Sequence, residues 1–317
     1  MTQTIFDNWK PEHSRLWGQA PVVQQHTLHK SPLFTDEALA ELIENYPRAD
    51  YSLVVPGRQD QDHHHKWREG DIGDASGAEV LKAIKEGFLW INLRNLPLND
   101  PHYKQLTDEL FDEMQANVPG LKVKKSEMTL LVTSPGAQTY YHCDVPGQSL
   151  WHIRGRKKVY LYPALDPFMP EELLERVILQ ESEEEIPFEH WFDDHALVLD
   201  LEPGTMVHWP QFAPHRVENY DSLCVSISTE YWTSEIERAY KVRYANGLLR
   251  RKFKIEPKST DTTGATYLSK AILQSLWRRS GLARKHIWAR KIEFKLDPAD
   301  PHNMLDITPF TLSPGNS

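Results

Sequence analysis

Residues 139–163 have the sequence TYYHCDVPGQSLWHIRGRKKVYLYP, and the rest of the chain is organised around this stretch. It is rich in aromatic and β-branched residues, which favours strands. His142 and Asp144 are two positions apart, so on a strand their side chains point to the same face. The sequence therefore predicts that one imidazole and one carboxylate converge from the same side.

A second stretch, residues 203–219 with the sequence PGTMVHWPQFAPHRVEN, supplies a further imidazole. His215 follows a turn that proline and glycine mark. Two histidines and one carboxylate with open coordination positions form the facial arrangement that suits non-haem Fe(II). We therefore expect His142, Asp144 and His215 to form an iron site on a β-barrel.

The residues around the triad decide between this interpretation and a purely structural one, because an H-x-D triplet alone is common. Gly136, Thr139 and His142 fit the pattern G-x-x-T-x-x-H, and an I-R-G turn at residues 153–155 leads into another β run. Together with P-H-R-V at residues 214–217, this pattern resembles the JmjC and cupin-like 2-oxoglutarate oxygenases. The resemblance is to the group around the asparaginyl hydroxylase that modifies hypoxia-inducible factor in particular.

The resemblance covers roughly residues 129–232 and implies a mainly β fold with helical flanks: a double-stranded β-helix, or jelly-roll, barrel followed by C-terminal helices. It implies Fe(II) held by His142, Asp144 and His215, with 2-oxoglutarate as co-substrate and O2 as oxidant. The reaction would couple oxidative decarboxylation of 2-oxoglutarate to hydroxylation of a C–H bond in a peptidyl or small-molecule substrate. His208 is the alternative distal ligand, but His215 follows the Pro/Gly turn as the family's ligand does.

The resemblance also places the co-substrate. It implies that the hydroxyl of Thr139 and the ammonium of Lys157 bind the distal carboxylate of 2-oxoglutarate. Alternation supports Lys157 independently, because Lys157, Val159 and Leu161 share one face of a strand. An ammonium on an otherwise apolar face needs an anionic partner, since burying an unpaired charge is costly.

Other cations near the second turn compete with Lys157 for this role. Arg154, Arg156 and Lys158 belong to the turn or to the opposite face, so we expect them in solvent. Other 2-oxoglutarate oxygenases use an arginine roughly ten residues after the distal histidine, but residues 217–237 contain no lysine or arginine. Lys157 is therefore the preferred partner of the co-substrate.

Further residues are candidates for the surroundings of the metal. Gln148 occupies a position where relatives often carry an amide or hydroxyl near the co-substrate. Cys143 lies between two ligands and should face away from the metal. Four residues are candidates for lining the cavity, although core packing is the better explanation for the two aromatic ones: Trp151, Ser226, Ser228 and Trp232.

Composition limits the class of protein. The chain of 317 residues has a net charge of −9 and only two cysteines, which predicts no disulfide framework and a reducing compartment, hence the cytoplasm. No apolar run is long enough to span a bilayer, and the N-terminus lacks the pattern of a signal peptide. Residues 234–296 carry 16 lysines and arginines against 5 acids, so a basic segment follows an acidic body.

We divide the chain into an oxygenase domain with an N-terminal helical part, residues 1–233, and a basic helical region, residues 234–317. The basic region is periodic in apolar residues, which favours docking on protein over binding of nucleic acid. Helices after the barrel are a common dimerisation element among the relatives that the resemblance implies, so we predict a homodimer. Its apolar contacts would come from Leu248, Leu249, Leu273, Leu276 and Trp277.

Local patterns predict the other elements. Thr35 should cap a helix over residues 36–46, and further helices are expected over residues 77–85, 101–118, 235–253 and 266–279. Three consecutive histidines, His63 to His65, lie in a polar segment that reads as a solvated loop. Residues 297–317 read as an irregular tail.

Three rival functions share parts of this pattern. N-methyl demethylation begins with the same hydroxylation and differs in the substrate carbon. A nucleic-acid-binding regulator would use the basic helices, but no zinc motif or RNA-binding aromatic pattern supports it. A metal-binding cupin without turnover is the third, although such proteins usually show H-x-H with a nearby glutamate. The substrate itself is not fixed by the fold.

Overall fold

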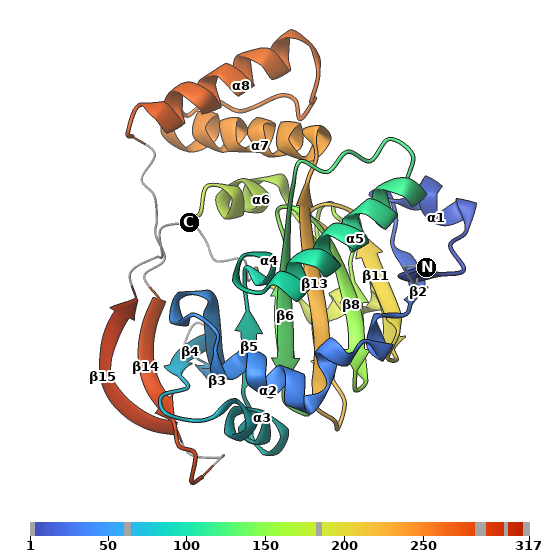
Figure 1. Cartoon of the computed structure of the whole chain (residues 1–317). Helices are drawn as coiled ribbons and strands as arrows, with labels where there is room; N and C mark the ends of the chain where they lie inside the picture. Colours follow the sequence, from blue (N-terminus) through green and yellow to red (C-terminus); the bar gives the residue numbers. More distant parts are fainter. Residues whose placement is uncertain (1–3, 60–64, 182–185, 283–289, 301–303, 313–317) are drawn as a thin grey trace.

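The computed structural model describes the chain except for residues 1–3, 60–64, 182–185, 283–289, 301–303 and 313–317 (Figure 1). Within the described part, the strands form two sheets. The larger has the order β1-β2-β11-β8-β13-β6-β5-β3-β4-β14-β15, and the smaller has the order β10-β9-β12-β7. The strands are β1 (Phe6–Asp7), β2 (Val22–His26), β3 (Tyr51–Gln59), β4 (His65–Asp71), β5 (Trp90–Leu93), β6 (Lys125–Thr133), β7 (Gln138–His142), β8 (Gly147–Arg154), β9 (Lys157–Leu161), β10 (Leu197–Leu201), β11 (Thr205–Trp209), β12 (His215–Asn219), β13 (Cys224–Trp232), β14 (Arg290–Leu296) and β15 (Met304–Leu312).

Helices make up at least as large a share of the structure as strands do, so "mainly β" understates them. The α-helices are α1 (Pro11–Leu16), α2 (Asp36–Glu44), α3 (Gly77–Glu86), α4 (Leu96–Asn99), α5 (Pro101–Asn117), α6 (Glu171–Ile178), α7 (Ser234–Lys252) and α8 (Gly264–Arg279). The described residues also form the short 3-10 helices η1 (Leu28–Lys30), η2 (Pro32–Phe34), η3 (Arg48–Asp50) and η4 (His190–His195).

Capping explains where the helices begin, and it confirms the sequence-based expectation for α2. The side chain of Thr35 accepts a hydrogen bond from the backbone N–H of Ala38. Helix α3 starts with a capping box, in which Ser76 and Glu79 each accept from the other's backbone. Helix α7 is capped by Thr233, one residue before the predicted Ser234.

The two sheets pack around an apolar cluster that both of them line. Leu150 and Val207 come from the larger sheet, and Val159, Leu161 and Leu201 come from the smaller one. The alternation of β9 explains this, because its buried residues Lys157, Val159 and Leu161 are separated by less buried ones. The face of each sheet that meets this cluster is called the inner face below.

The opposite, outer face of the larger sheet packs against helices α2, α3 and α5 (Figure 1). Ile91, Leu130 and Ile227 on its strands are fully buried there with Leu39 of α2 and Leu110 of α5. The outer face of the smaller sheet is covered separately. Its residues pack with α6 and α7 in a third cluster that includes Tyr141, Tyr162, Leu174 and Leu248.

The C-terminal region departs from the prediction. Helices α7 and α8 form where expected, and Gly281 after α8 has a positive φ of 72°. The prediction of an irregular tail was wrong for Met304–Leu312, which is strand β15 and pairs antiparallel with β14. Strand β14 in turn pairs in parallel with β4, so this hairpin belongs to the same sheet as the N-terminal half of the chain.

The prediction of a loop around the three histidines was also wrong for the second half of that polar segment. Strand β4 runs from His65 to Asp71 and pairs with β3. Charged residues on a partly exposed sheet face hide the alternation that marks a strand. His63 and His64 lie outside the described residues.

Candidate metal centre

Three side chains predicted to bind a metal lie together between the two sheets. One ligand atom from each of His142, Asp144 and His215 lies within 4.8 Å of the others, the only group of its kind among the residues that the structure describes. His215 Nε2 is 3.2 Å from Asp144 Oδ2, and the two imidazole ring centres are 4.1 Å apart. Ligands at right angles around one ion, with bonds of about 2.1 Å, are about 3 Å apart. The spacing therefore fits a shared metal.

The strands fix the orientation of both histidines. His142 ends β7 and His215 begins β12, and the two residues are direct partners across this strand pair. Each ring is held by a backbone carbonyl: His142 Nδ1 is 2.7 Å from Tyr140 O, and His215 Nδ1 is 3.1 Å from Ala213 O. A carbonyl accepts only from a protonated nitrogen, so in the neutral form of each ring the lone pair lies on Nε2, where a metal ligand needs it.

Burial sets the charges at the site. Burial, and then the neighbouring His215, lower the pKa of His142 to about 4, so its ring is neutral near pH 7. Burial works to raise the pKa of Asp144, but attraction to His215 and His142 outweighs it and lowers that pKa. The site thus offers an anion from Asp144 and a neutral nitrogen from His142, and the His215 imidazole completes a donor set that suits Fe(II).

Gln148 on β8 supports the carboxylate ligand. In the amide orientation that satisfies both ends, its nitrogen donates to both oxygens of Asp144 and its oxygen accepts from Ser228 Oγ at 2.7 Å. Such contacts aim a ligand and tune its basicity. Gln148 therefore contacts a metal ligand directly, and Ser228 acts through Gln148.

Thr139 shares a face with His142 because β7 contains a bulge. His142 pairs with His215 and Thr139 pairs with Val217, so three residues of β7 match two of β12. His215 and Val217 point to the same face, so their partners do as well. The side chain of Thr139 is exposed, on the same face of the sheet as His142.

Lys157 lies further along the same inner face. It pairs with Asn219, and Leu161 on the same strand pairs with His215. Its side chain is 3% exposed, and among the residues that the structure describes no carboxylate pairs with it. Burial lowers the pKa of Lys157, which is the mark of an ammonium without a counter-ion.

The rival cations are engaged elsewhere. Arg154 binds Asp36 at 2.7 Å, and Arg156 binds Glu202 at 2.6 Å. Lys158 lies 5.6 Å from the ring centre of Tyr220 on the outer face. Lys157 is thus the cation of this group that turns inward.

The remaining candidates fall into two groups. Ser226 and Ser228 lie on the inner face, where Ser226 Oγ is 3.1 Å from His152 Nδ1. Trp151 lies in the outer core, donating to Thr229 Oγ1 at 2.9 Å, so it does not line the site. Trp232 stacks edge-on against Tyr240 of α7, at 5.6 Å.

Two residues close to the predicted ligands, His208 and Cys143, have structural roles. His208 stacks on Trp17 with a ring separation of 3.8 Å and accepts from the backbone N–H of Gly18 at 3.0 Å. It is therefore not the distal ligand. Cys143 packs with Tyr141 in the outer cluster of the smaller sheet, facing away from the triad.

The sequence did not identify the aromatic residues around the triad. Trp209 lies 4.5 Å from the His215 ring. Trp67 on β4 contacts Trp90 on β5 at 4.7 Å and Tyr140 on β7 at 4.9 Å, so it joins the larger sheet to the edge of the smaller one. Only the alternation of Trp67 and Glu69 on β4 could have revealed this contact, and that strand was not predicted.

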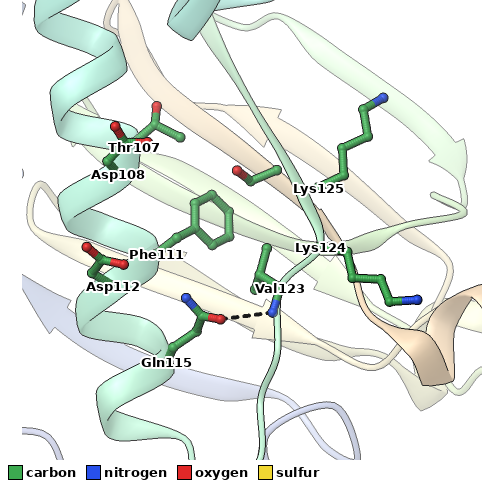
Figure 2. A pocket seen from close by; sticks show the side chains of 9 residues that line it. Thr107, Asp108, Phe111, Asp112, Gln115, Val123, Lys124 and Lys125 are labelled. Carbon is green, nitrogen blue, oxygen red and sulfur yellow. Dashed lines mark hydrogen bonds between the residues drawn. The ribbon is translucent and has the colours of Figure 1, made fainter.

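A surface hollow elsewhere on the molecule is separate from the triad. It has a volume of about 330 Å³ and lies between α5 and the start of β6 (Figure 2). Phe111 and Gln115 line it from the helix, and Gln115 accepts a hydrogen bond from the backbone N–H of Val123. Thr107, another lining residue, contacts Met128 on the outer face of the sheet, so the hollow opens on the side away from the metal ligands.

Comparison with known proteins shows the fold. The chain is similar to an X-ray structure of YcfD from Escherichia coli, with 14% sequence identity, a TM-score of 0.50, and coverage of 90% of this chain and 70% of that one. A second structure, YcfD described as a ribosomal oxygenase in complex with cobalt and 2-oxoglutarate, matches at 15% identity with a TM-score of 0.49, covering 89% and 68%. At these identities the likeness is one of fold alone. No protein-family model matches the chain, and no curated protein sequence matches it.

Proposed function

We propose that this chain is an Fe(II)- and 2-oxoglutarate-dependent oxygenase of the JmjC and cupin-like type, with a double-stranded β-helix core, and that it hydroxylates a C–H bond of a peptidyl or small-molecule substrate. One observation carries the proposal. A facial set of two imidazoles and a carboxylate shares its sheet face with a buried lysine that has no counter-ion among the described residues.

The donor set suits the metal. His142, Asp144 and His215 would hold Fe(II) through two neutral nitrogens and one carboxylate oxygen, leaving the other side of the ion for small molecules. Gln148 would keep the Asp144 carboxylate in place. When bound, Fe(II) and 2-oxoglutarate together supply the activation of O2, and the protein supplies orientation and the exclusion of water.

The spacing between the triad and Lys157 suits the co-substrate. Leu161, the partner of His215, is four residues from Lys157 along β9, which corresponds to about 13 Å. A lysine side chain and a five-carbon dicarboxylate can span this distance together. Lys157 would bind the distal carboxylate, with the Thr139 hydroxyl at the intermediate level of Val217.

The apolar cluster between the sheets explains how Lys157 would act selectively. Val159, Leu161 and Val207 surround this part of the inner face and are fully or almost fully buried. In such a setting a charge-assisted hydrogen bond is stronger than in water. A dianion is thus favoured over neutral molecules of similar size.

The proposal is tested by metal and co-substrate binding together with turnover. The wild-type protein should bind Mn(II) and then 2-oxoglutarate in calorimetry, and with Fe(II) and O2 it should convert 2-oxoglutarate to succinate. Asp144→Ala should abolish succinate formation, whereas the exposed Asp200→Ala should retain it. Failure of the wild type to bind either ligand, or turnover that survives Asp144→Ala, would exclude the oxygenase.

The basic helices are better explained by contacts within the protein than by nucleic acid. Arg243 binds Glu171 at 2.9 Å, and Arg250 binds Glu175 at 2.9 Å. These pairs join α7 to the acidic α6, which removes the free positive charge that phosphate contacts would need. No helix among the described residues is long and apolar enough to cross a bilayer.

Two further parts of the proposal concern assembly and location. Leu268, Ile272 and Leu276 form a stripe along α8 and are 59–61% exposed, which supports a homodimer through the C-terminal helices. Of the predicted contact residues, Leu276 belongs to this stripe, whereas Leu248 is buried. Both cysteines are free, which supports the cytoplasm as the location.

A further inference from the structure

The inner face of the larger sheet changes character where the smaller sheet no longer covers it. On β13, β6 and β5 it carries Ser228, Thr129 and Asn92 in place of the valines and leucines of the covered part. Ser228 pairs with Thr129, and Asn92 pairs with Ser52 on β3. Thr129 and Asn92 are partly exposed although their strands lie in the middle of the sheet. A polar, partly open face therefore continues from the metal site.

Arg94 continues this face at the end of β5. Its backbone N–H donates to Asp50 O at 2.8 Å, which extends the pairing with β3 by one residue. Ile91 and Leu93 are fully buried in the outer core, and Asn92 points inward between them. Alternation then turns the Arg94 side chain to the inner face.

Arg94 lies at the level of the metal ligands. Leu93 pairs with Leu130, so the next pair across β5 and β6 is Arg94 opposite Thr129. Thr129 pairs with Ser228, which contacts Gln148 beside Asp144. Neighbouring strands are about 4.8 Å apart, so the Arg94 and Ser228 backbones are about 10 Å apart on the same face. Lys157 lies on the smaller sheet and Arg94 follows a strand of the larger one, so the two cations come from opposite walls of the site.

Within the described part of the chain, the Arg94 guanidinium has no direct ion-pair partner, and the carboxylates nearest to it are bound by other residues. Arg48 donates to Asp71 at 2.7 Å, and Arg290 donates to Glu69 at 3.0 Å. The carboxylate of Asp50 accepts from two asparagine side chains, those of residues 95 and 99. None of the described residues forms a hydrogen bond or ion pair with the Arg94 guanidinium. Burial, and then repulsion from Arg290, lower the pKa of Arg94, and the attraction of the Glu69 and Asp50 carboxylates offsets this only in part.

We propose that Arg94 is a specificity-determining residue that binds a carboxylate of the substrate while the reacting C–H bond lies at the metal. The inference rests on the proposed function and adds the chemical class of its substrate, a carboxylic acid. One guanidinium presents two parallel donors, which match one carboxylate. The other two arginines of the neighbourhood are already paired, so the site carries the charge for a single carboxylate.

Thermal unfolding in the presence of small carboxylates and their amides tests the inference. The pairs are acetate and acetamide, benzoate and benzamide, and N-acetylglycine and its amide, at constant ionic strength, with and without Mn(II) and N-oxalylglycine. We expect at least one acid to stabilise the wild type more than its amide does. Arg94→Gln should weaken the binding of that acid by about tenfold or more, and Arg94→Lys should retain part of the preference for the acid over its amide. The exposed Arg15→Gln should behave as the wild type.

The stability of the unliganded variants distinguishes binding from a structural role. Arg290→Gln removes a paired cation and should lower the melting temperature, whereas Arg94→Gln removes an unpaired one and should leave it unchanged or raise it. The inference is overturned if no acid is preferred over its amide, if Arg94→Gln keeps the preference, or if it destabilises the protein as much as Arg290→Gln. Calorimetry of Mn(II) and N-oxalylglycine with the wild type tests the proposed function separately. The preference for acids over amides is also measured without these two ligands, so failure of one proposal can be told from failure of the other.

Discussion

Replacing Lys157 by methionine should weaken co-substrate binding and stabilise the free protein at the same time. The side chain is 3% exposed on an apolar face, and methionine fills a similar volume without the charge. An ordinary buried ion pair would give the opposite result for stability, because breaking it leaves an uncompensated partner. Weaker co-substrate binding together with higher stability of the free protein would therefore identify Lys157 as a cation whose partner is a ligand.

The structure sets the size of both effects. A hydrogen bond to a charged partner contributes about 1.5–3 kcal/mol, so Lys157→Met should weaken 2-oxoglutarate binding by about 10- to 150-fold. Leaving a buried donor unsatisfied costs about 1–3 kcal/mol, and the unliganded variant should gain stability of that order. Burial is the main cause of the lowered Lys157 pKa, which agrees with a gain in stability when the charge is removed.

Calorimetry of 2-oxoglutarate with the Mn(II)-loaded protein measures the affinity, and urea unfolding of the metal-free protein measures the stability. Lys158→Met is the matched control, since Lys158 is the next residue and lies on the outer face beside Tyr220. It should change neither quantity appreciably. If Lys157→Met bound 2-oxoglutarate as tightly as the wild type, or unfolded more easily, the role of Lys157 as a ligand-binding cation would be refuted.

Three further predictions follow from contacts at the site, in the core and on the surface. Gln148→Leu should lower Mn(II) affinity by about 10- to 100-fold in a titration followed by electron paramagnetic resonance, because Asp144 loses its support; unchanged affinity would contradict this. Burial lowers the pKa of His208 to about 4 from 6.5, so the unfolded chain takes up this proton first as the pH falls. The metal-free protein should lose about 2 kcal/mol from this residue between pH 7 and pH 5, and a His208→Gln variant with the same pH dependence in urea unfolding would disprove it. Leu276→Glu should shift a dimer to monomers in sedimentation velocity, whereas a wild type that stays monomeric at high concentration would count against the dimer.

Local pattern was enough to predict much of the core of this site. Alternation around Lys157 translates directly into one face of β9. The spacing of two between His142 and Asp144 predicted their proximity, although β7 ends at His142 and Asp144 lies just after the strand. The Pro/Gly turn before His215 was equally visible in the sequence. The structure brings these residues together because β7, β12 and β9 are neighbours in the smaller sheet.

Features that depend on register could not be predicted in the same way. Thr139 is three residues before His142, so plain alternation places it on the opposite face, and only the bulge in β7 reverses this. Arg94 lacks a direct ion-pair partner because the nearby carboxylates of Asp71 and Glu69 are bound by Arg48 and Arg290. No local sequence signal carries that information.

The C-terminal strands were missed for a different reason. Strand β15 is largely exposed, so it lacks the alternation of apolar and polar residues that marks a half-buried strand. Strand β14 does alternate, with Ile292, Phe294 and Leu296 buried between polar residues, but its partner β4 lies far away in the sequence. Propensity within a window of ten residues cannot contain such a pairing.

The pairing of β14 with β4 also determines the order in which the molecule can be assembled. Arg290 and Glu69 are 221 residues apart, and closing so long a loop is entropically costly and slow. Until it closes, β4 is an unprotected sheet edge, and it carries Trp67, which reaches across to the metal-binding strand. The edge that carries Trp67 is thus closed only by residues that a ribosome makes long after the ligands themselves, and a nascent chain holding all three ligands still has an open sheet edge.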